Sequence, residues 1–227
     1  MSSMNKRAFV ITGASGATGA AAARAFAAQG ASLALLGTDQ VRLEALGREL
    51  ALPAARLLTL KADLRRAEAV HAAAQAVGDK FGRVDGLIHL VGGWVGGRVL
   101  AETPEADFAA MLEQHAWTTF HLLKEFGPRL AANGWGRVIV VTAPGAVDPQ
   151  GRAGAYTAAK AAQENLVRNA AVELGPSHVT ANIIQVRSID VKGGGQGTPP
   201  GEIVAAMLYL CSDEAGGISG ARLPLFR

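Results

Sequence analysis

The feature that most constrains how this chain folds is an alternation of two periodicities along its whole length. Short runs that are apolar at nearly every position, such as FVIT and RVIVV, are typical of strands covered on both faces of a sheet. Between them lie longer, alanine-rich stretches with helical spacing. Strands are expected at Ala8–Thr12, Ser32–Leu36, Arg56–Leu60, Val84–Leu90, Val138–Thr142 and Val179–Ile184, with a short closing strand near Ala221–Leu225.

Helices are expected at Ala17–Gln29, Val41–Leu50, Ala67–Lys80, Pro104–Ala132, Ala155–Leu174 and Glu202–Leu210. Strand–helix–strand repetition produces parallel pairing with right-handed crossovers. No linker interrupts the repetition, and 227 residues suit one large domain. We therefore expect residues 1–227 to form a single doubly wound, Rossmann-like α/β domain, with a parallel sheet of about seven strands flanked by helices.

Composition and charge exclude several classes of function. The 22 Lys and Arg are interspersed with 19 Asp and Glu, so no basic block is available to bind nucleic acid. No stretch approaches the roughly 18 apolar residues of a membrane span, and no secretory signal is visible. The single cysteine, Cys211, can build neither a disulfide nor a metal cluster. A soluble, cytoplasmic protein without a metal site is expected.

A glycine-rich turn follows the first expected strand, where the sequence reads TGASGATG and then enters a helix. A diphosphate must approach backbone N–H groups closely, and side chains at Gly13 and Gly19 would obstruct it. The helix N-terminus adds partial positive charge. The turn therefore favours a dinucleotide site, with a purely structural turn as the alternative. The candidate binding residues are Thr12, Gly13, Ser15, Gly16, Ala17, Thr18 and Gly19.

Tyr156 and Lys160 form a second constellation, on the helix after the fifth expected strand. Their i, i+4 spacing places both side chains on one face, one turn apart. A phenol with an ordinary pKa of about 10 is a slow acid or base at neutral pH. We expect the lysine ammonium to lower that pKa toward neutrality, which makes the pair candidate catalytic residues.

The glycine turn, the Y-x-x-x-K pair and the strand–helix order together resemble the short-chain dehydrogenase/reductase family, over essentially the whole chain. The family's turn reads T-G-x-x-x-G-x-G; Thr12, Gly13 and Gly19 match it, and Ala17 replaces its middle glycine. The resemblance implies a hydride-transferring enzyme with NAD(P)H as cofactor. It also implies a small-molecule substrate and a homodimer or homotetramer.

Further cofactor contacts are implied by the same resemblance, at Thr38, Asp63, Leu64, Val91, Gly92 and Gly93, besides the tyrosine and lysine. The family's aspartate after the third strand accepts from the adenine amino group; a helix N-cap is the other interpretation of Asp63. An acidic residue after the second strand selects NAD, and a basic one selects NADP. Here Gly37 and Thr38 precede Asp39, with Arg42 nearby, so the choice stays open.

The chain departs from the family at two catalytic positions. The serine that binds the substrate oxygen falls on Ala143; the adjacent Thr142 carries a hydroxyl, but strand alternation directs it to the other face unless the register slips. The asparagine that organises a water relay falls on His115, which we interpret as a packed or surface residue. His89, at a strand end, is interpreted as structural.

These departures resemble the dihydropteridine reductase branch of the family. That branch has a GGW string after the fourth strand, matched by Gly92, Gly93 and Trp94, and Q-x-x-W-T in the long helix, matched at 114–118. It also lacks the serine and keeps Y-x-x-x-K. A dihydropterin needs a hydride and a proton, with no alkoxide for a hydroxyl to stabilise. Trp94 would stack on a flat heterocycle or plug a loop onto the core.

The sequence thus predicts an NAD(P)-dependent oxidoreductase that passes a hydride to a small carbonyl or dihydropteridine-type acceptor. Trp94, Thr142 and Ala143 are the expected substrate-pocket residues. Two alternatives remain: a carbonyl reductase of unidentified substrate, and a catalytically silent dinucleotide-binding sensor. The glycine-rich loop Val191–Gly201 is either a lid or an ordinary surface loop.

Overall fold

A computed structural model describes residues 4–226 of the chain; residues 1–3 and 227 lie outside the described part. Seven parallel strands form one sheet in the order β3-β2-β1-β4-β5-β6-β7. Their bounds are β1 Ala8–Thr12, β2 Ser32–Gly37, β3 Leu57–Lys61, β4 Gly86–His89, β5 Gly136–Thr142, β6 Val179–Gln185 and β7 Arg222–Pro224. The reversal of strand order between β1 and β4 creates the crevice in which doubly wound proteins bind ligands.

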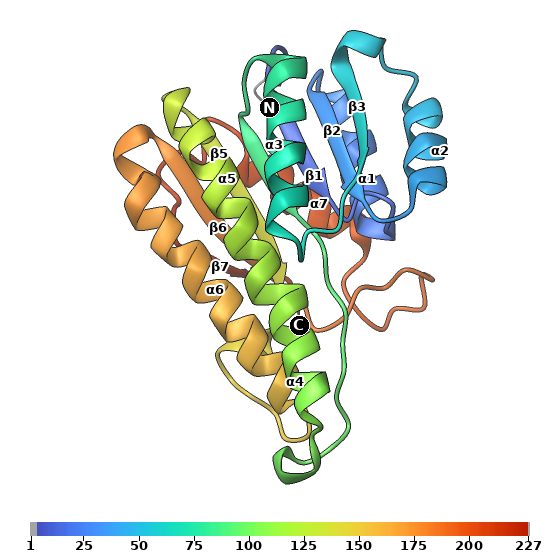
Figure 1. The fold of residues 1–227 in the computed structure, drawn as a ribbon, viewed down its shortest axis with the longest axis vertical. Coiled ribbons are helices and arrows are strands. Elements are labelled where there is room, and N and C mark those ends of the chain that lie inside the picture. Colours follow the sequence, from blue (N-terminus) through green and yellow to red (C-terminus); the bar gives the residue numbers. More distant parts are fainter. Residues whose placement is uncertain (1–3, 227) are drawn as a thin grey trace.

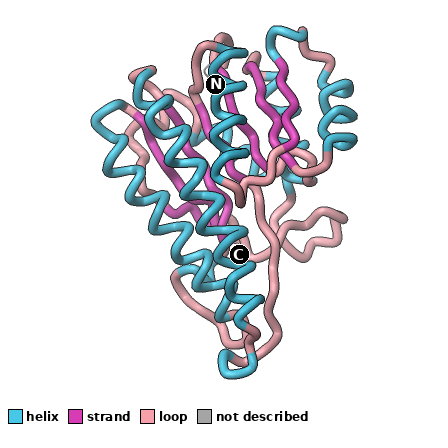
Figure 2. Tube along the Cα trace, viewed as in Figure 1, coloured by secondary structure: helices cyan, strands magenta, loops and turns pink. Residues whose placement is uncertain are grey.

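The helices cover both faces of this sheet (Figure 1). Their bounds are α1 Ala17–Ala28, α2 Gln40–Leu50, α3 Ala67–Phe81, α4 Glu105–Leu112, α5 Thr118–Ala132, α6 Gly154–Leu174 and α7 Pro200–Leu210. Helices α3, α5 and α6 lie on one face and α1, α2 and α7 on the other (Figure 2). The expected doubly wound, three-layer α/β architecture is confirmed.

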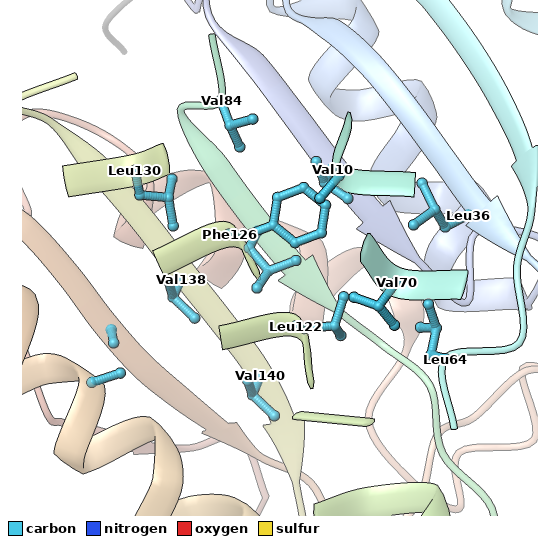
Figure 3. Packing of buried hydrophobic residues seen from close by; sticks show 14 of the residues in the cluster. Val10, Leu36, Leu64, Val70, Val84, Leu122, Phe126, Leu130, Val138 and Val140 are labelled. Carbon is cyan, nitrogen blue, oxygen red and sulfur yellow. The ribbon is translucent and has the colours of Figure 1, made fainter. Parts of the chain in front are cut away.

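Burial explains why the strands are apolar throughout. Val10 faces the α3/α5/α6 layer and its neighbour Ile11 faces the α1/α2/α7 layer, and both side chains are completely buried. Figure 3 shows Phe126 of α5 packed among Val10, Val138 and other side chains of the first core. Because the central strands β1 and β4 are sandwiched between two cores, alternating polar positions there would leave polar atoms in a dry interior.

The helix expected over Pro104–Ala132 is interrupted. Its first turns form α4 and its last form α5, with a π-helical turn, Glu113–Trp117, between them. The backbone N–H of Thr118 donates to the carbonyl of Glu113, five residues earlier, which is the π spacing. The sequence prediction of one uninterrupted α-helix was therefore wrong at these five residues. Such turns are frequent at functional sites.

The described residues contain no membrane-spanning helix and no cluster of metal-binding side chains, and their single cysteine is buried. No helix among residues 4–226 is long and apolar enough to cross a membrane. Within the same residues, no group of three or more His, Cys, Asp or Glu side chains is arranged to hold a metal ion. Cys211 is buried and free, as expected for a small apolar side chain, and burial raises the pKa of its thiol to about 12.

Candidate active site

The glycine turn between β1 and α1 is shaped by two close approaches. Gly13 has φ of +65°, and a Cβ there would lie 3.0 Å from the carbonyl carbon and oxygen of Leu90. A Cβ on Gly19 would lie only 2.2 Å from the carbonyl oxygen of Gly13. Neither position therefore accepts a side chain without a shift of the backbone. The hydroxyl oxygen of Thr18 is buried beside them without a partner among the described residues.

Two adjoining cavities open on either side of this turn, at the carboxyl edge of the sheet. Gly13, Gly16, Leu90, Val91 and Gly92 border both of them. The first, about 380 Å³, is completed by Ala17, Thr18, Gly19, Gly93, Trp94, Val141, Thr142, Tyr156, Lys160, Val186, Arg187, Ser188, Ile189 and Val191. The second, about 470 Å³, is completed by Ser15, Gly37, Thr38, Arg42, Ala62, Asp63, Leu64, Arg65, Ala110, Gln114 and Thr118. Thr12 lies buried beneath the turn.

In the second cavity the carboxylate of Asp63 is paired with Arg65. Arg65 Nε donates to Oδ1 at 2.9 Å and Nη2 to Oδ2 at 2.8 Å. This hydrogen-bonded pair holds the pKa of the Asp63 carboxyl below its usual range. The N-cap of α3 is Arg66, not Asp63, so the helix-cap interpretation of this aspartate was wrong. Thr38 lies exposed on the same wall.

The first cavity brings Tyr156 and Lys160 together. Lys160 Nζ lies 5.9 Å from the centroid of the Tyr156 ring and donates to the carbonyl of Val141 at 3.1 Å. It donates again to Gln163 Oε1, at 2.9 Å. Burial lowers the pKa of Lys160 to about 7, against an opposing pull from the Glu164 carboxylate.

We expected Lys160 to lower the pKa of Tyr156, and the structure indicates the opposite direction. Burial raises the pKa of Tyr156 above its ordinary value, and no cation offsets that effect. Burial lowers the pKa of Lys160 to about 7, so that the lysine is only partly protonated at neutral pH, and its amine donates to Val141 and Gln163. The hydroxyl of Tyr156 therefore keeps its proton at neutral pH in this state.

Thr142 borders the first cavity, but its hydroxyl is bonded to a buried carboxylate. The β5–β6 register is regular to its end, with Thr142 opposite Gln185, so no slip turns the side chain. Its hydroxyl donates to Glu164 Oε1 at 2.5 Å. Ala143 is buried and is not among the residues that border the first cavity, so its place in the substrate pocket stays a prediction.

Glu164 is a buried carboxylate that the sequence reasoning missed. Besides the Thr142 hydroxyl, it accepts from Gln185 Nε2 at 2.8 Å and from Arg222 Nε at 2.5 Å. Glu164 and Gln163 follow Lys160 by four and three residues, so all three share one face of α6. Two polar residues at that spacing, in a helix whose inner face is otherwise apolar, are the sequence signal that was available.

His115 lies on the π-turn and is completely buried, which confirms its interpretation as a packed residue. Its ring meets the Tyr156 ring edge-on, with centroids 5.5 Å apart. Nε2 lies 3.1 Å from the carbonyl oxygen of Gly93, which can only accept, so Nε2 carries the proton. Nδ1 is then a bare acceptor, buried without a partner among the described residues. Burial lowers the pKa of His115 to about 3.

His89 joins the glycine turn to the π-turn. Its Nδ1 lies 2.7 Å from Thr12 Oγ1, and its Nε2 lies 3.3 Å from Thr118 Oγ1. The hydroxyl of Thr118 donates its proton to the carbonyl of Gln114, so it can only accept from His89 Nε2. Nδ1 is then unprotonated and accepts from the hydroxyl of Thr12. The backbone N–H of Leu90 donates to Thr12 Oγ1 and completes the chain. Burial lowers the pKa of His89 to about 3, which supports its structural interpretation.

Trp94 stands at the mouth of the first cavity. Its side chain is 62% exposed, so it does not plug a loop onto the core. A Cβ on Gly96 would lie 2.6 Å from the Trp94 ring, so that glycine leaves room for the indole. The loop between β6 and α7 extends beyond the sheet nearby, and its Val191 also borders the cavity (Figure 1).

A parallel sheet with a glycine turn at its carboxyl edge, and a tyrosine–lysine pair in the adjoining cavity, define a dinucleotide-dependent oxidoreductase. Residues 7–196 match the model of the short chain dehydrogenase family, and the chain belongs to that family. It is an NAD(P)-dependent oxidoreductase.

Named relatives and solved structures agree with this membership. A 7alpha-hydroxysteroid dehydrogenase of Escherichia coli (strain K12) is 28% identical, over 93% of this chain and 89% of its own. The structure of an NAD+-bound xylitol dehydrogenase superposes with a TM-score of 0.88, at 23% identity, over 99% of both chains. A 3-ketoacyl-(acyl-carrier-protein) reductase of Brucella melitensis, complexed with NADH, gives 0.89 at 22% identity, over 98% of both.

Proposed function

We propose that this chain is an NAD(P)H-dependent reductase in which Tyr156 donates a proton to a small acceptor bound in the first cavity. The observation that carries the proposal is the placement of Tyr156, together with Lys160 on the same helix face, in the cavity that adjoins the glycine turn. Burial raises the pKa of its phenol, so the hydroxyl enters the site with a proton to give, which suits reduction rather than oxidation. Lys160, fixed on the same helix face, positions the phenol and the cofactor.

The residues of the turn fit a dinucleotide. Gly13 and Gly19 leave a surface that a Cβ would fill, and the N-terminus of α1 presents free N–H groups to a diphosphate. Ser15, Gly16, Ala17 and Thr18 complete the proposed diphosphate subsite. Thr38, Asp63 and Leu64 line the second cavity, where adenosine would lie, while Val91, Gly92 and Gly93 lead from there toward Tyr156. When bound, the nicotinamide supplies the hydride.

The acceptor we propose is of the dihydropteridine type. The hydroxyl of Thr142 is donated to Glu164, and Ala143 has none, so the strand end offers no side-chain donor for a developing alkoxide. An acceptor that gains a hydride and a proton on an electron-poor ring needs no such donor. Trp94, exposed at the cavity mouth, offers a flat surface on which a heterocycle stacks.

A carbonyl compound is the second candidate. The relative of 28% identity named above is a 7alpha-hydroxysteroid dehydrogenase, and its name indicates a hydroxysteroid substrate. Val186, Ile189 and Val191 also give the cavity an apolar wall, which suits a hydrophobic ketone.

Turnover of quinonoid dihydrobiopterin, measured beside a panel of ketones, separates the two acceptors. Activity with ketones alone would refute the dihydropteridine proposal. Fluorescence titration with NADH and NADPH identifies the cofactor, and failure to bind either nucleotide would refute the proposed function as a whole.

Replacing Tyr156 with Phe tests the proton donor. We expect turnover of the best acceptor to fall by at least about a hundredfold, the usual contribution of general acid catalysis, with nucleotide affinity retained. The ring and its contact with His115 remain in this variant, so the fold is preserved. Unchanged turnover would show that the Tyr156 hydroxyl is not the proton donor and would refute that role.

A further inference from the structure

Beneath the Tyr156–Lys160 pair lies a buried polar chain that the proposed reaction does not use. Lys160 Nζ donates to Gln163 Oε1 at 2.9 Å, and Gln163 Nε2 donates to Thr119 Oγ1 at 2.8 Å. Thr119 in turn donates to the carbonyl of His115, at 2.7 Å. The side chains of Lys160, Gln163 and Thr119 are all buried, so no solvent competes for these bonds.

The direction of every bond in this chain is fixed by chemistry. A lysine ammonium has no acceptor, so the amide of Gln163 must turn its oxygen toward Lys160 and its nitrogen toward Thr119. A hydroxyl that accepts from that nitrogen still has its proton for a carbonyl. The three hydrogen bonds therefore all run in one direction, from Lys160 to the carbonyl of His115. Exchanging the oxygen and nitrogen of the Gln163 amide would break both bonds that this side chain makes.

This series of hydrogen bonds ends on the π-turn between α4 and α5. The carbonyl of His115 accepts from the side chain of Thr119 in the first turn of α5, four residues later. Gln163 comes from α6, and thus it joins the helix that carries the tyrosine and lysine to the turn that carries His115. Lys160 is held at two points, the Val141 carbonyl and Gln163, which leaves one of its three protons to face the cavity.

We propose that Gln163 is a positioning residue for the reaction proposed above: its amide oxygen holds the Lys160 ammonium in place and favours the charged form of that lysine. The inference rests on the proposed function for its catalytic meaning. The hydrogen bond from Lys160 to Gln163, which stabilises a buried cation, is present without any nucleotide. Its effect can therefore be measured on the protein alone.

The charged and titratable groups around Lys160 come from three elements. Glu164 on α6 stabilises its charge, whereas His89 at the end of β4 and His115 on the π-turn share the buried region and are neutral. Tyr156 lies on the same helix face. With burial lowering the pKa of Lys160 to about 7, the loss or gain of one acceptor changes how much of the lysine is charged at neutral pH.

The test is the titration midpoint of Lys160, followed by NMR on protein labelled with ¹³C at lysine Cε, with no nucleotide present. A Lys160→Arg variant assigns the resonance. We expect Gln163→Leu to lower the midpoint by about one pH unit, because one hydrogen bond to the ammonium is lost. Gln163→Glu, which places a carboxylate there, raises it by a similar amount. Gln75→Leu, an exposed glutamine on α3, leaves it unchanged.

Opposite shifts in the two Gln163 variants support the proposal, because a purely structural role would move both in the same direction. A midpoint that moves in neither variant would overturn it. Should Gln163→Leu fail to fold, Thr119→Val is the second variant. It keeps Gln163 as the acceptor for Lys160 but removes the hydroxyl that Gln163 Nε2 donates to, so a smaller decrease of the Lys160 midpoint is expected. Because no nucleotide is present, this result is independent of whether the protein binds NADH or NADPH.

Discussion

At the scale of single residues, the site depends on the lack of a Cβ atom at two glycines as much as on the side chains that line it. Gly13 and Gly19 bring two backbone segments closer together than any side chain permits. Ala17, in contrast, replaces a family glycine without disturbing the start of α1, and it borders the first cavity. The turn therefore needs glycine at particular places, where the backbone itself is the obstacle.

A residue-scale prediction concerns Gly19. Its replacement by Ala would place a Cβ 2.2 Å from the carbonyl oxygen of Gly13, so the turn must open. We expect nucleotide affinity, measured by fluorescence titration, to fall more than tenfold, equivalent to about 1.4 kcal/mol. Gly78→Ala in α3 is the control: its Cβ meets nothing within 4 Å, and it stabilises the helix by roughly 0.5–1 kcal/mol. Equal affinity in both variants would contradict this account.

At the scale of elements, α6 carries most of the site. Tyr156 and Lys160 face the cavity, and the next turn presents Gln163 and Glu164 to the interior. The carboxylate of Glu164 connects this helix to three strands, because its donors belong to β5, β6 and β7. The short closing strand β7 is thus tied to α6 by the ion pair between Arg222 and Glu164.

Replacing Glu164 by Ala is expected to destabilise the protein by about 3 kcal/mol, since it leaves the hydroxyl of Thr142 and the amide of Gln185 buried without an acceptor. Arg222 is partly exposed and adds little. The measurement is the free energy of unfolding in urea. Glu173→Ala, an exposed position on the same helix, is expected to change it by less than about 0.5 kcal/mol. Similar losses in both variants would show that the carboxylate network is not stabilising.

At the scale of the whole molecule, two neutral histidines lie in the interior near the site. His89 and His115 each have a pKa lowered to about 3 by burial, against about 6.5 in an unfolded chain. Between these values the unfolded state binds more protons than the folded one, so acid favours unfolding. The contribution of these groups to stability is fully present above about pH 6.5 and is lost as the pH falls toward 3.

We therefore expect the free energy of unfolding to decrease with acidification below about pH 6.5, by up to about 1.4 kcal/mol per pH unit for each histidine. Urea unfolding at a series of pH values gives the slope. His115→Phe should reduce that slope, because one of the two buried histidines no longer takes up a proton on unfolding. A slope that His115→Phe leaves intact would show that this histidine is not held neutral in the fold.

Secondary structure and fold class were predictable because they depend on local patterning. The apolar runs at Ala8–Thr12 and Val179–Ile184 became buried strands within one residue of their expected ends. The glycine turn and the Tyr156–Lys160 pair were predictable for a related reason, since spacing alone places their atoms on one turn or one helix face. The strand expected at Val84–Leu90 is shorter, and at its beginning Asp85 turns its carboxylate to Ala8 and Arg83.

The sequence by itself determined that this chain folds into a doubly wound sheet with a nucleotide turn at its carboxyl edge, because periodicity and glycine placement act within a few residues. Only the tertiary structure decided how polar side chains pair across elements. In the folded protein, the hydroxyl of Thr142 donates to Glu164 and Lys160 donates to Gln163. The helix that contains His115 also forms a π-turn there. The physical reason is that a buried polar atom must find a partner, and the partner comes from whichever element the fold brings alongside.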